Sequence, residues 1–136
     1  MWGKSATAVI VHGRCPFNAE AAAWALARDE ITALDTFYCR NHGPIPDISV
    51  DDWRLTVDGL VTNPLSLTFD DLTNTFRAHT VVTTLQCAGN RRAGFNKIQE
   101  IIGEDPWGPG ATSTAEWRGV RLADVLAAAG THRDDG

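Results

Sequence analysis

The pattern of hydrophobic and polar positions predicts short strands and short helices. Residues 53–58 alternate apolar and polar side chains, which is the period of a half-buried strand. The run Thr-Val-Val-Thr at 80–83 is rich in β-branched residues and predicts a mostly buried strand. The apolar positions of 122–126 fit one helical face, and Gly130 is suited to end that helix. Strands and helices do not alternate regularly, so we do not expect a doubly wound parallel sheet.

Helix signals and breakers divide the rest of the chain. Residues 1–17 are expected to form an extended arm. Asn18 is a suitable N-cap, and the alanine-rich run 19–29 that follows it has high helix propensity. Thr68 is a second candidate N-cap, because two aspartates follow it in what would be a first turn. Proline and glycine exclude regular structure at 106–110.

Composition narrows the class of protein. The chain has 136 residues, enough for one modest domain, and its 43% apolar content suits a packed protein. A net charge of −5 argues against a nucleic-acid partner, and no run reaches the roughly 18 apolar residues of a membrane span. The three cysteines form no C-x-x-C pair, which disfavours structural zinc and a disulfide framework. We therefore expect a reducing, cytoplasmic location, since no convincing signal peptide is present.

The strand at 80–83 leads into the most informative stretch, residues 84–92, which read TLQCAGNRR. It places a thiol, Cys87, at a strand end, where it can face a cleft. Gly89 lets backbone approach a ligand closely, and the amide and guanidinium groups that follow can bind an anion or fix the loop. Nearby positive charge favours the thiolate, which binds soft metals or attacks electrophiles. The alternative is that Cys87 is a small buried hydrophobe. Residues 93–96 are expected to form a loop.

A second stretch, residues 37–46, reads FYCRNHGPIP. Its aromatic start is strand-like, and its proline-rich end forces an extended exit. Between them Arg40, Asn41 and His42 place three polar side chains at a strand-to-loop junction, where sites tend to be built. The alternative is structural: Arg40 pairs with an acidic neighbour and His42 caps a turn.

Both stretches resemble segments of one family. TLQCAGNRR resembles the signature of the sulfite oxidase family of molybdenum enzymes, which includes the molybdenum domain of assimilatory nitrate reductases. FYCRNHGPIP resembles the pterin-contacting segment of that family, and residues 110–122 also resemble it. The resemblance implies an α+β fold, mixed and mostly β, of the sulfite-oxidase molybdopterin-binding type. It also implies that residues 1–136 are the N-terminal portion of that domain, without its C-terminal remainder or the dimerisation domain.

The resemblance implies a molybdopterin-dependent oxidoreductase that transfers an oxygen atom to or from a small oxyanion such as sulfite. Cys87 would bind the metal, and Arg40 would act with it at the substrate pocket. The cofactor-binding residues would be Tyr38, Cys39, Arg40, Asn41, His42 and Cys87. The electron acceptor is unknown, and homodimers are expected in the family.

Two other functions stay open at this stage. One is a truncated, non-catalytic remnant that binds the cofactor or serves as an assembly module. The other is a cysteine-nucleophile enzyme in which a histidine activates Cys87.

Overall fold

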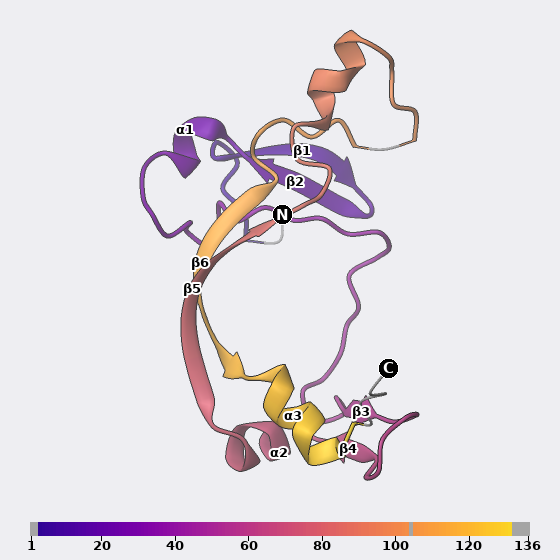
Figure 1. Cartoon of the computed structure of the whole chain (residues 1–136). Coiled ribbons are helices and arrows are strands. Elements are labelled where there is room, and N and C mark those ends of the chain that lie inside the picture. The colour runs from indigo at the N-terminus through magenta and orange to yellow at the C-terminus, as the bar shows by residue number, and fades with distance from the viewer. Residues whose placement is uncertain (1–2, 104, 132–136) are drawn as a thin grey trace. The chain divides into compact units, whose positions relative to one another are not determined.

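The computed structural model describes residues 3–103 and 105–131, and Figure 1 shows the order of its elements. The chain divides into two compact units, each considered by itself below. Unit 1 comprises residues 1–46 and 82–116, and unit 2 comprises residues 47–81 and 117–136. The elements are β1 (Val9–Arg14), β2 (Phe17–Ala21), α1 (Ala23–Leu26), β3 (Leu55–Val57), β4 (Leu65–Leu67), α2 (Phe69–Thr75), β5 (Ala78–Gln86), the 3-10 helix η1 (Arg92–Lys97), β6 (Thr112–Val120) and α3 (Leu122–Ala129).

Strands β1 and β2 of unit 1 form an antiparallel hairpin. It turns at a cis peptide bond between Cys15 and Pro16. Val9 of β1 and Phe17 and Ala19 of β2 make a buried apolar cluster. Residues 9–14 of the expected extended arm are therefore the first strand of a sheet, and Phe17 starts the second.

The helix predicted from residue 19 is wrong in its first part. Ala19 and Ala21 belong to β2, and the helix is limited to Ala23–Leu26. The N–H and C=O of Ala19 both bond to Cys39, at 2.9 and 2.8 Å, so sheet pairing replaces the helical bonds. Both alanine side chains are buried. Burial and long-range pairing therefore override the intrinsic helix propensity of alanine.

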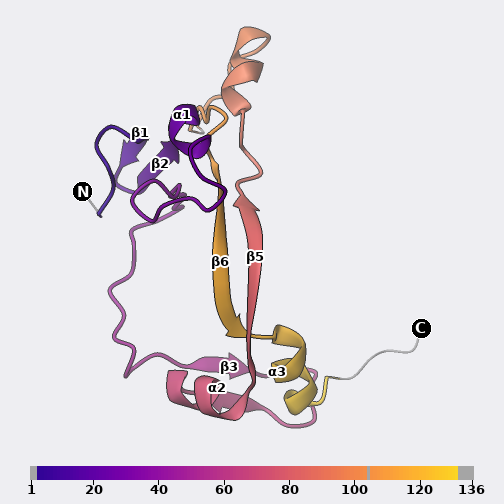
Figure 2. The same cartoon turned by 90° about the vertical axis from the view of Figure 1, so that its left-hand side faces the viewer.

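Strands β5 and β6 pair in a sheet of two strands, and Figure 2 shows them side by side. The strand predicted at 80–83 is present, but its predicted burial is wrong. Val81 and Val82 are 55% and 61% exposed. Within the described part of the chain, β5 has a strand partner only in β6, and a two-stranded ribbon leaves most of its side chains in solvent.

Unit 2 agrees with the local sequence signals. Strand β3 shows the predicted alternation, with Leu55 and Val57 half-buried and Thr56 exposed, and it pairs antiparallel with β4. Thr68 caps α2 through a capping box with Asp71. Gly130 ends α3 with φ of 66°, the left-handed conformation that glycine adopts readily.

The described residues thus form small sheets with few helices, which agrees with the expected mixed, mostly β structure. In this part of the chain, every helix is too short or too polar to cross a lipid bilayer.

Candidate functional site

Cys87 lies directly after β5, in a tight turn of unit 1. Its N–H donates to the carbonyl of Ala111 at 2.9 Å, and its carbonyl accepts from the N–H of Asn90 at 2.9 Å. The Sγ atom accepts a hydrogen bond from the N–H of Gly89 at 3.4 Å. The side chain is half-buried and forms no disulfide. The sulfur therefore lies at a strand end and outside the apolar cluster of the hairpin.

The residues that follow Cys87 hold this turn in place. Asn90 accepts a hydrogen bond from the N–H of Ala111 at 3.0 Å through Oδ1. Arg92 donates to the carbonyl of Asp105 at 3.2 Å. A side chain at Gly89 would put its Cβ 2.6 Å from the Arg92 guanidinium, so a larger residue there would displace that guanidinium. The polar groups after Cys87 were expected either to bind an anion or to fix the loop. In the structure, Asn90 and Arg92 fix the loop.

Arg91 adopts a left-handed conformation, with φ of 68°, and its N–H donates to Gly108 at 2.8 Å. The side chain of Arg91 is exposed. The residues after it form η1, where a loop was predicted at 93–96. The N–H of Gly94 donates to the carbonyl of Arg91, and similar short-range hydrogen bonds stabilise this 3-10 helix.

The segment 38–42 is attached to the hairpin through Cys39. Residue 39 forms an isolated bridge with Ala19, in place of the strand expected to start at Phe37. The Cys39 side chain packs against the apolar cluster of Val9, Phe17 and Ala19. The N–H of Tyr38 donates to Ser113 Oγ at 3.1 Å. Sheet pairing on one side and β6 on the other therefore fix the start of this segment.

Tyr38 connects the two sequence motifs. Burial raises the pKa of the Tyr38 phenol above its usual 10.0, and negative charge on Cys87 raises it further. The second effect requires the phenol to lie within electrostatic reach of the sulfur. The fold thus brings together residues that are 49 positions apart in the sequence.

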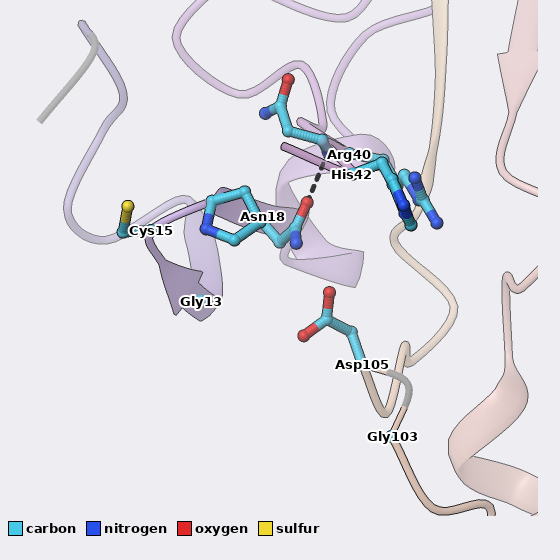
Figure 3. Close-up of a pocket in the computed structure, with 9 residues that line it drawn as sticks. Gly13, Cys15, Asn18, Arg40, His42, Gly103 and Asp105 are labelled. Atoms are coloured by element: carbon cyan, nitrogen blue, oxygen red, sulfur yellow. Dashed lines mark hydrogen bonds between the residues drawn. The ribbon is translucent and has the colours of Figure 1, made fainter. Parts of the chain in front are cut away.

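The remaining residues of the segment face an open pocket of about 540 Å³, shown in Figure 3. Asn41 is held there because its N–H donates to Asn18 Oδ1 at 2.6 Å. The pocket brings Arg40, Asn41 and His42 together, but it is not lined by Tyr38, Cys39 or Cys87. Its lining residues are Gly13, Cys15, Pro16, Asn18, Arg40, Asn41, His42, Gly103 and Asp105.

The pocket is chemically suited to an anion with its own hydrogen-bond donors and acceptors. Arg40 supplies a permanent positive charge, and the side chains of Asn18 and Asn41 supply amide groups. Asp105 adds a carboxylate on the opposite wall in Figure 3. A ligand there would meet both signs of charge, so the pocket can orient it as well as attract it.

Sequence reasoning missed the contribution of the hairpin to this pocket. Asn18 was interpreted as a helix cap, and Asp105 was given no role. One signal was available for Asn18: apolar Phe17, Ala19 and Ala21 alternate with polar Asn18 and Glu20, which is the period of a strand. No local signal indicates Asp105, because an irregular loop brings it to the pocket.

Comparison with protein families gives one match that covers most of the chain. Residues 42–136 match a family described as "Oxidoreductase molybdopterin binding domain". The matched region includes His42, Cys87 and the turn that follows Cys87, while Tyr38, Cys39, Arg40 and Asn41 lie just before it.

Several characterised proteins are similar to nearly the whole chain. A sulfite oxidase, mitochondrial, of Rattus norvegicus is 47% identical over 93% of this chain, which spans 23% of that protein. A nitrate reductase [NAD(P)H] of Betula pendula is 44% identical over 90% of this chain, which spans 14% of that protein. The chain therefore spans about a quarter or less of these relatives.

A solved structure has a similar fold. The sulfane dehydrogenase SoxCD from Paracoccus pantotrophus superimposes with a TM-score of 0.70 and 29% sequence identity, over 88% of this chain and 30% of that chain. This solved structure therefore shares its fold with most of the chain.

Proposed function

Because the chain belongs to the family of oxidoreductase molybdopterin-binding domains, we propose that it holds a molybdenum cofactor through Cys87 and supports a sulfite-oxidase-type reaction. The observation that carries this proposal is the position of the Cys87 sulfur. It is half-buried at a strand end, where the Cys87 N–H donates to the carbonyl of Ala111 and Sγ accepts from the N–H of Gly89. It also lies within electrostatic reach of Tyr38, in the segment that carries Arg40.

The donor set fits such a cofactor. A free thiol is a soft ligand of the kind that stabilises a redox-active heavy metal. The neighbouring segment offers a guanidinium, an amide and an imidazole, all of which can donate hydrogen bonds to an anionic pterin. Gly89 packs against the Arg92 guanidinium and Trp107, so the backbone of the turn two residues after Cys87 is closely supported.

Each residue of the segment has a distinct proposed role. Arg40 binds the oxyanion substrate, because removing an anion from water is costly unless a cation replaces its hydration. Asn41 and His42 bind the pterin and its phosphate, and Tyr38 acts from within electrostatic reach of the metal ligand. Cys39 was expected near the cofactor as well, and that role stays a prediction, since its side chain packs against the hairpin cluster. The two-electron chemistry of oxygen-atom transfer is supplied by the cofactor.

The proposed substrate class is a small oxyanion. The names of the relatives include sulfite oxidase and nitrate reductase, which share a small anionic substrate with oxygen atoms around a central atom. Arginine is the side chain best suited to such planar or pyramidal anions, because its guanidinium donates in a fixed fork. The electron acceptor, the homodimer and the cytoplasmic location also remain predictions.

Replacement of the sulfur tests the proposal directly. Cys87→Ser keeps the size of the side chain but replaces a soft ligand with a hard one, so the protein expressed in a molybdenum-cofactor-competent host should lose most of its molybdenum. Thr56→Ser, at an exposed position of β3 and outside the pocket lining, is the control and should leave the metal content unchanged. Equal molybdenum content in Cys87→Ser and the unmodified chain would refute the ligand assignment.

A further inference from the structure

A buried carboxylate in the hairpin has no role in the site described so far. Glu20 of β2 is 3% exposed, although an ionised carboxylate is rarely buried without partners. Its Oε2 accepts a hydrogen bond from the N–H of Gly110 at 3.2 Å. Its Oε1 lies 3.3 Å from Nε2 of His12, on the neighbouring strand. The imidazole in turn packs edge-on against Trp107, with ring centroids 4.9 Å apart.

These contacts fix one edge of the segment 107–111, which we call the Trp107 segment. Besides the bond from Gly110 to Glu20, the N–H of Ala21 donates to the carbonyl of Gly110 at 3.0 Å. Trp107 itself is 1% exposed. The hairpin therefore holds the Trp107 segment by a side chain, by the backbone and by aromatic packing.

The other edge of the Trp107 segment holds the cysteine turn. The carbonyl of Ala111 accepts from the N–H of Cys87, and the carbonyl of Gly108 accepts from the N–H of Arg91. The carbonyl of Trp107 accepts from the N–H of Ala93 at 2.9 Å. A shift of the Trp107 segment would therefore move the backbone of Cys87 with it.

Close packing leaves little freedom between Glu20 and this segment. A Cβ at Gly108 would lie 2.6 Å from Oε1 of Glu20, and one at Gly110 would collide with the carbonyl of Ala21. Glycine is therefore needed at 110, where the clash is with backbone, whereas a side chain at 108 would displace the Glu20 carboxylate. The position of the carboxylate and the position of the segment determine each other.

We propose that Glu20 is a positioning residue for Cys87, acting through the Trp107 segment. The carboxylate holds the N–H of Gly110, and the adjacent carbonyl of Ala111 then fixes the N–H of Cys87. His12 Nε2 lies 3.3 Å from Oε1 on the other side of the carboxylate, and among the described residues it makes no hydrogen bond. This inference rests on the proposed function only because that function makes Cys87 the metal ligand. The contacts themselves involve no cofactor.

The test measures the Cys87 thiol in the metal-free chain, so it does not depend on cofactor loading. Glu20→Leu removes the acceptor, while Glu20→Gln keeps an oxygen acceptor without the charge. Charge-assisted hydrogen bonds are about twice as strong as neutral ones, so the rate of Cys87 alkylation should rise in the order wild type, Glu20→Gln, Glu20→Leu. We expect an increase of about tenfold for Glu20→Leu, the change that corresponds to loss of one hydrogen bond to a charged group. Mass spectrometry of the digested protein measures the extent of alkylation at each cysteine separately.

Val9→Ala is the matched control. It weakens the apolar cluster of the same hairpin, but Val9 belongs to the cluster with Phe17 and Ala19 and not to the contacts with the Trp107 segment. It should leave the rate of Cys87 alkylation within about twofold of wild type. The exposed thiol of Cys15 is the internal control, and its own alkylation rate should stay within about twofold of wild type in every variant. An equal rise in Val9→Ala and Glu20→Leu would mean general loosening of the hairpin and would overturn the proposal.

Amide hydrogen exchange provides a second measurement if Glu20→Leu does not fold. In Glu20→Gln the amides of Gly110 and Cys87 should exchange several-fold faster, whereas the amide of Ala22, which bonds to Ala8 at the end of the hairpin, should not change. Unchanged exchange at Gly110 and Cys87 would contradict the proposed role of Glu20. A failure of Cys87→Ser to lose molybdenum would refute the ligand assignment but leave these exchange rates as predicted.

Discussion

Asn18 and Asn41 form a short hydrogen bond that connects the hairpin to the proposed substrate pocket. The N–H of Asn41 donates to Asn18 Oδ1 at 2.6 Å, and the Asn41 side chain donates to the carbonyl of Phe17 at 2.6 Å. Asn18 is buried, so its amide is protected from competition by water. This pair fixes the backbone between Arg40 and His42, the two residues with side chains able to carry positive charge in the pocket.

Asn18→Ala should destabilise the protein by about 1–3 kcal/mol, because it leaves a buried N–H of Asn41 without its acceptor. Denaturant unfolding measures the change. Asn63→Ala is the control: Asn63 is exposed and its side chain donates to Ala128 at a longer 3.3 Å, so the expected change is within about 0.5 kcal/mol. Equal effects of the two substitutions would argue against a structural role for the Asn18–Asn41 pair.

Arg40→Gln should weaken oxyanion binding by about tenfold or more, since it removes a hydrogen bond to a charged group. The cofactor should still load, because the sulfur ligand is intact. Isothermal calorimetry with sulfite on the cofactor-loaded chain measures the affinity, and elemental analysis measures the molybdenum. Arg118→Gln, an exposed position on β6, is the control for loss of one positive charge. If Arg40→Gln binds sulfite as tightly as Arg118→Gln does, the pocket assignment is wrong.

Cys87→Ala should lower the pKa of Tyr38. Burial is the larger cause of the raised value and remains in the variant, but the charge of the Cys87 thiolate is removed. The phenol should therefore ionise at a lower pH than in the unmodified chain, and still above 10.0. Tyr38 is the single tyrosine of the sequence, so the absorbance of tyrosinate during an alkaline titration reports on it alone. Cys15→Ala should give the titration curve of the unmodified chain.

Asp71→Asn should make stability in acid less dependent on pH. Hydrogen bonds from the backbone and then the side chain of Thr68 lower the pKa of Asp71 below its usual 3.8. A carboxyl with a lowered folded-state pKa adds stability above its unfolded pKa, and that stability is lost as the pH falls through the folded value. Thermal unfolding from about pH 6 to pH 2 would show a smaller decrease in the variant. Asp70→Asn, next to it in the same first turn, should keep the acid dependence of the unmodified chain, because Asp70 takes no part in the capping box.

The local sequence determined the elements whose signals are contained within a few residues. Thr68 and Asp71 define the start of α2, and Gly130 defines the end of α3, because capping groups and left-handed backbone act within one turn. The alternation at 53–58 likewise predicted β3. The motif at 84–92 identified the family and made Cys87 the proposed ligand, since the order of residue types in a contiguous motif is visible without a fold.

Only the tertiary structure decided which distant residues meet. The alanine-rich run after Asn18 has helical propensity, but pairing of Ala19 with Cys39 makes it a strand and turns Asn18 toward Asn41. Glu20 of the same strand is buried and reaches Gly110, 90 positions later in the chain. Propensity is a local preference of less than about 1 kcal/mol per residue. Burial and paired hydrogen bonds depend on partners that the local sequence does not reveal, and here they determine the surroundings of Cys87.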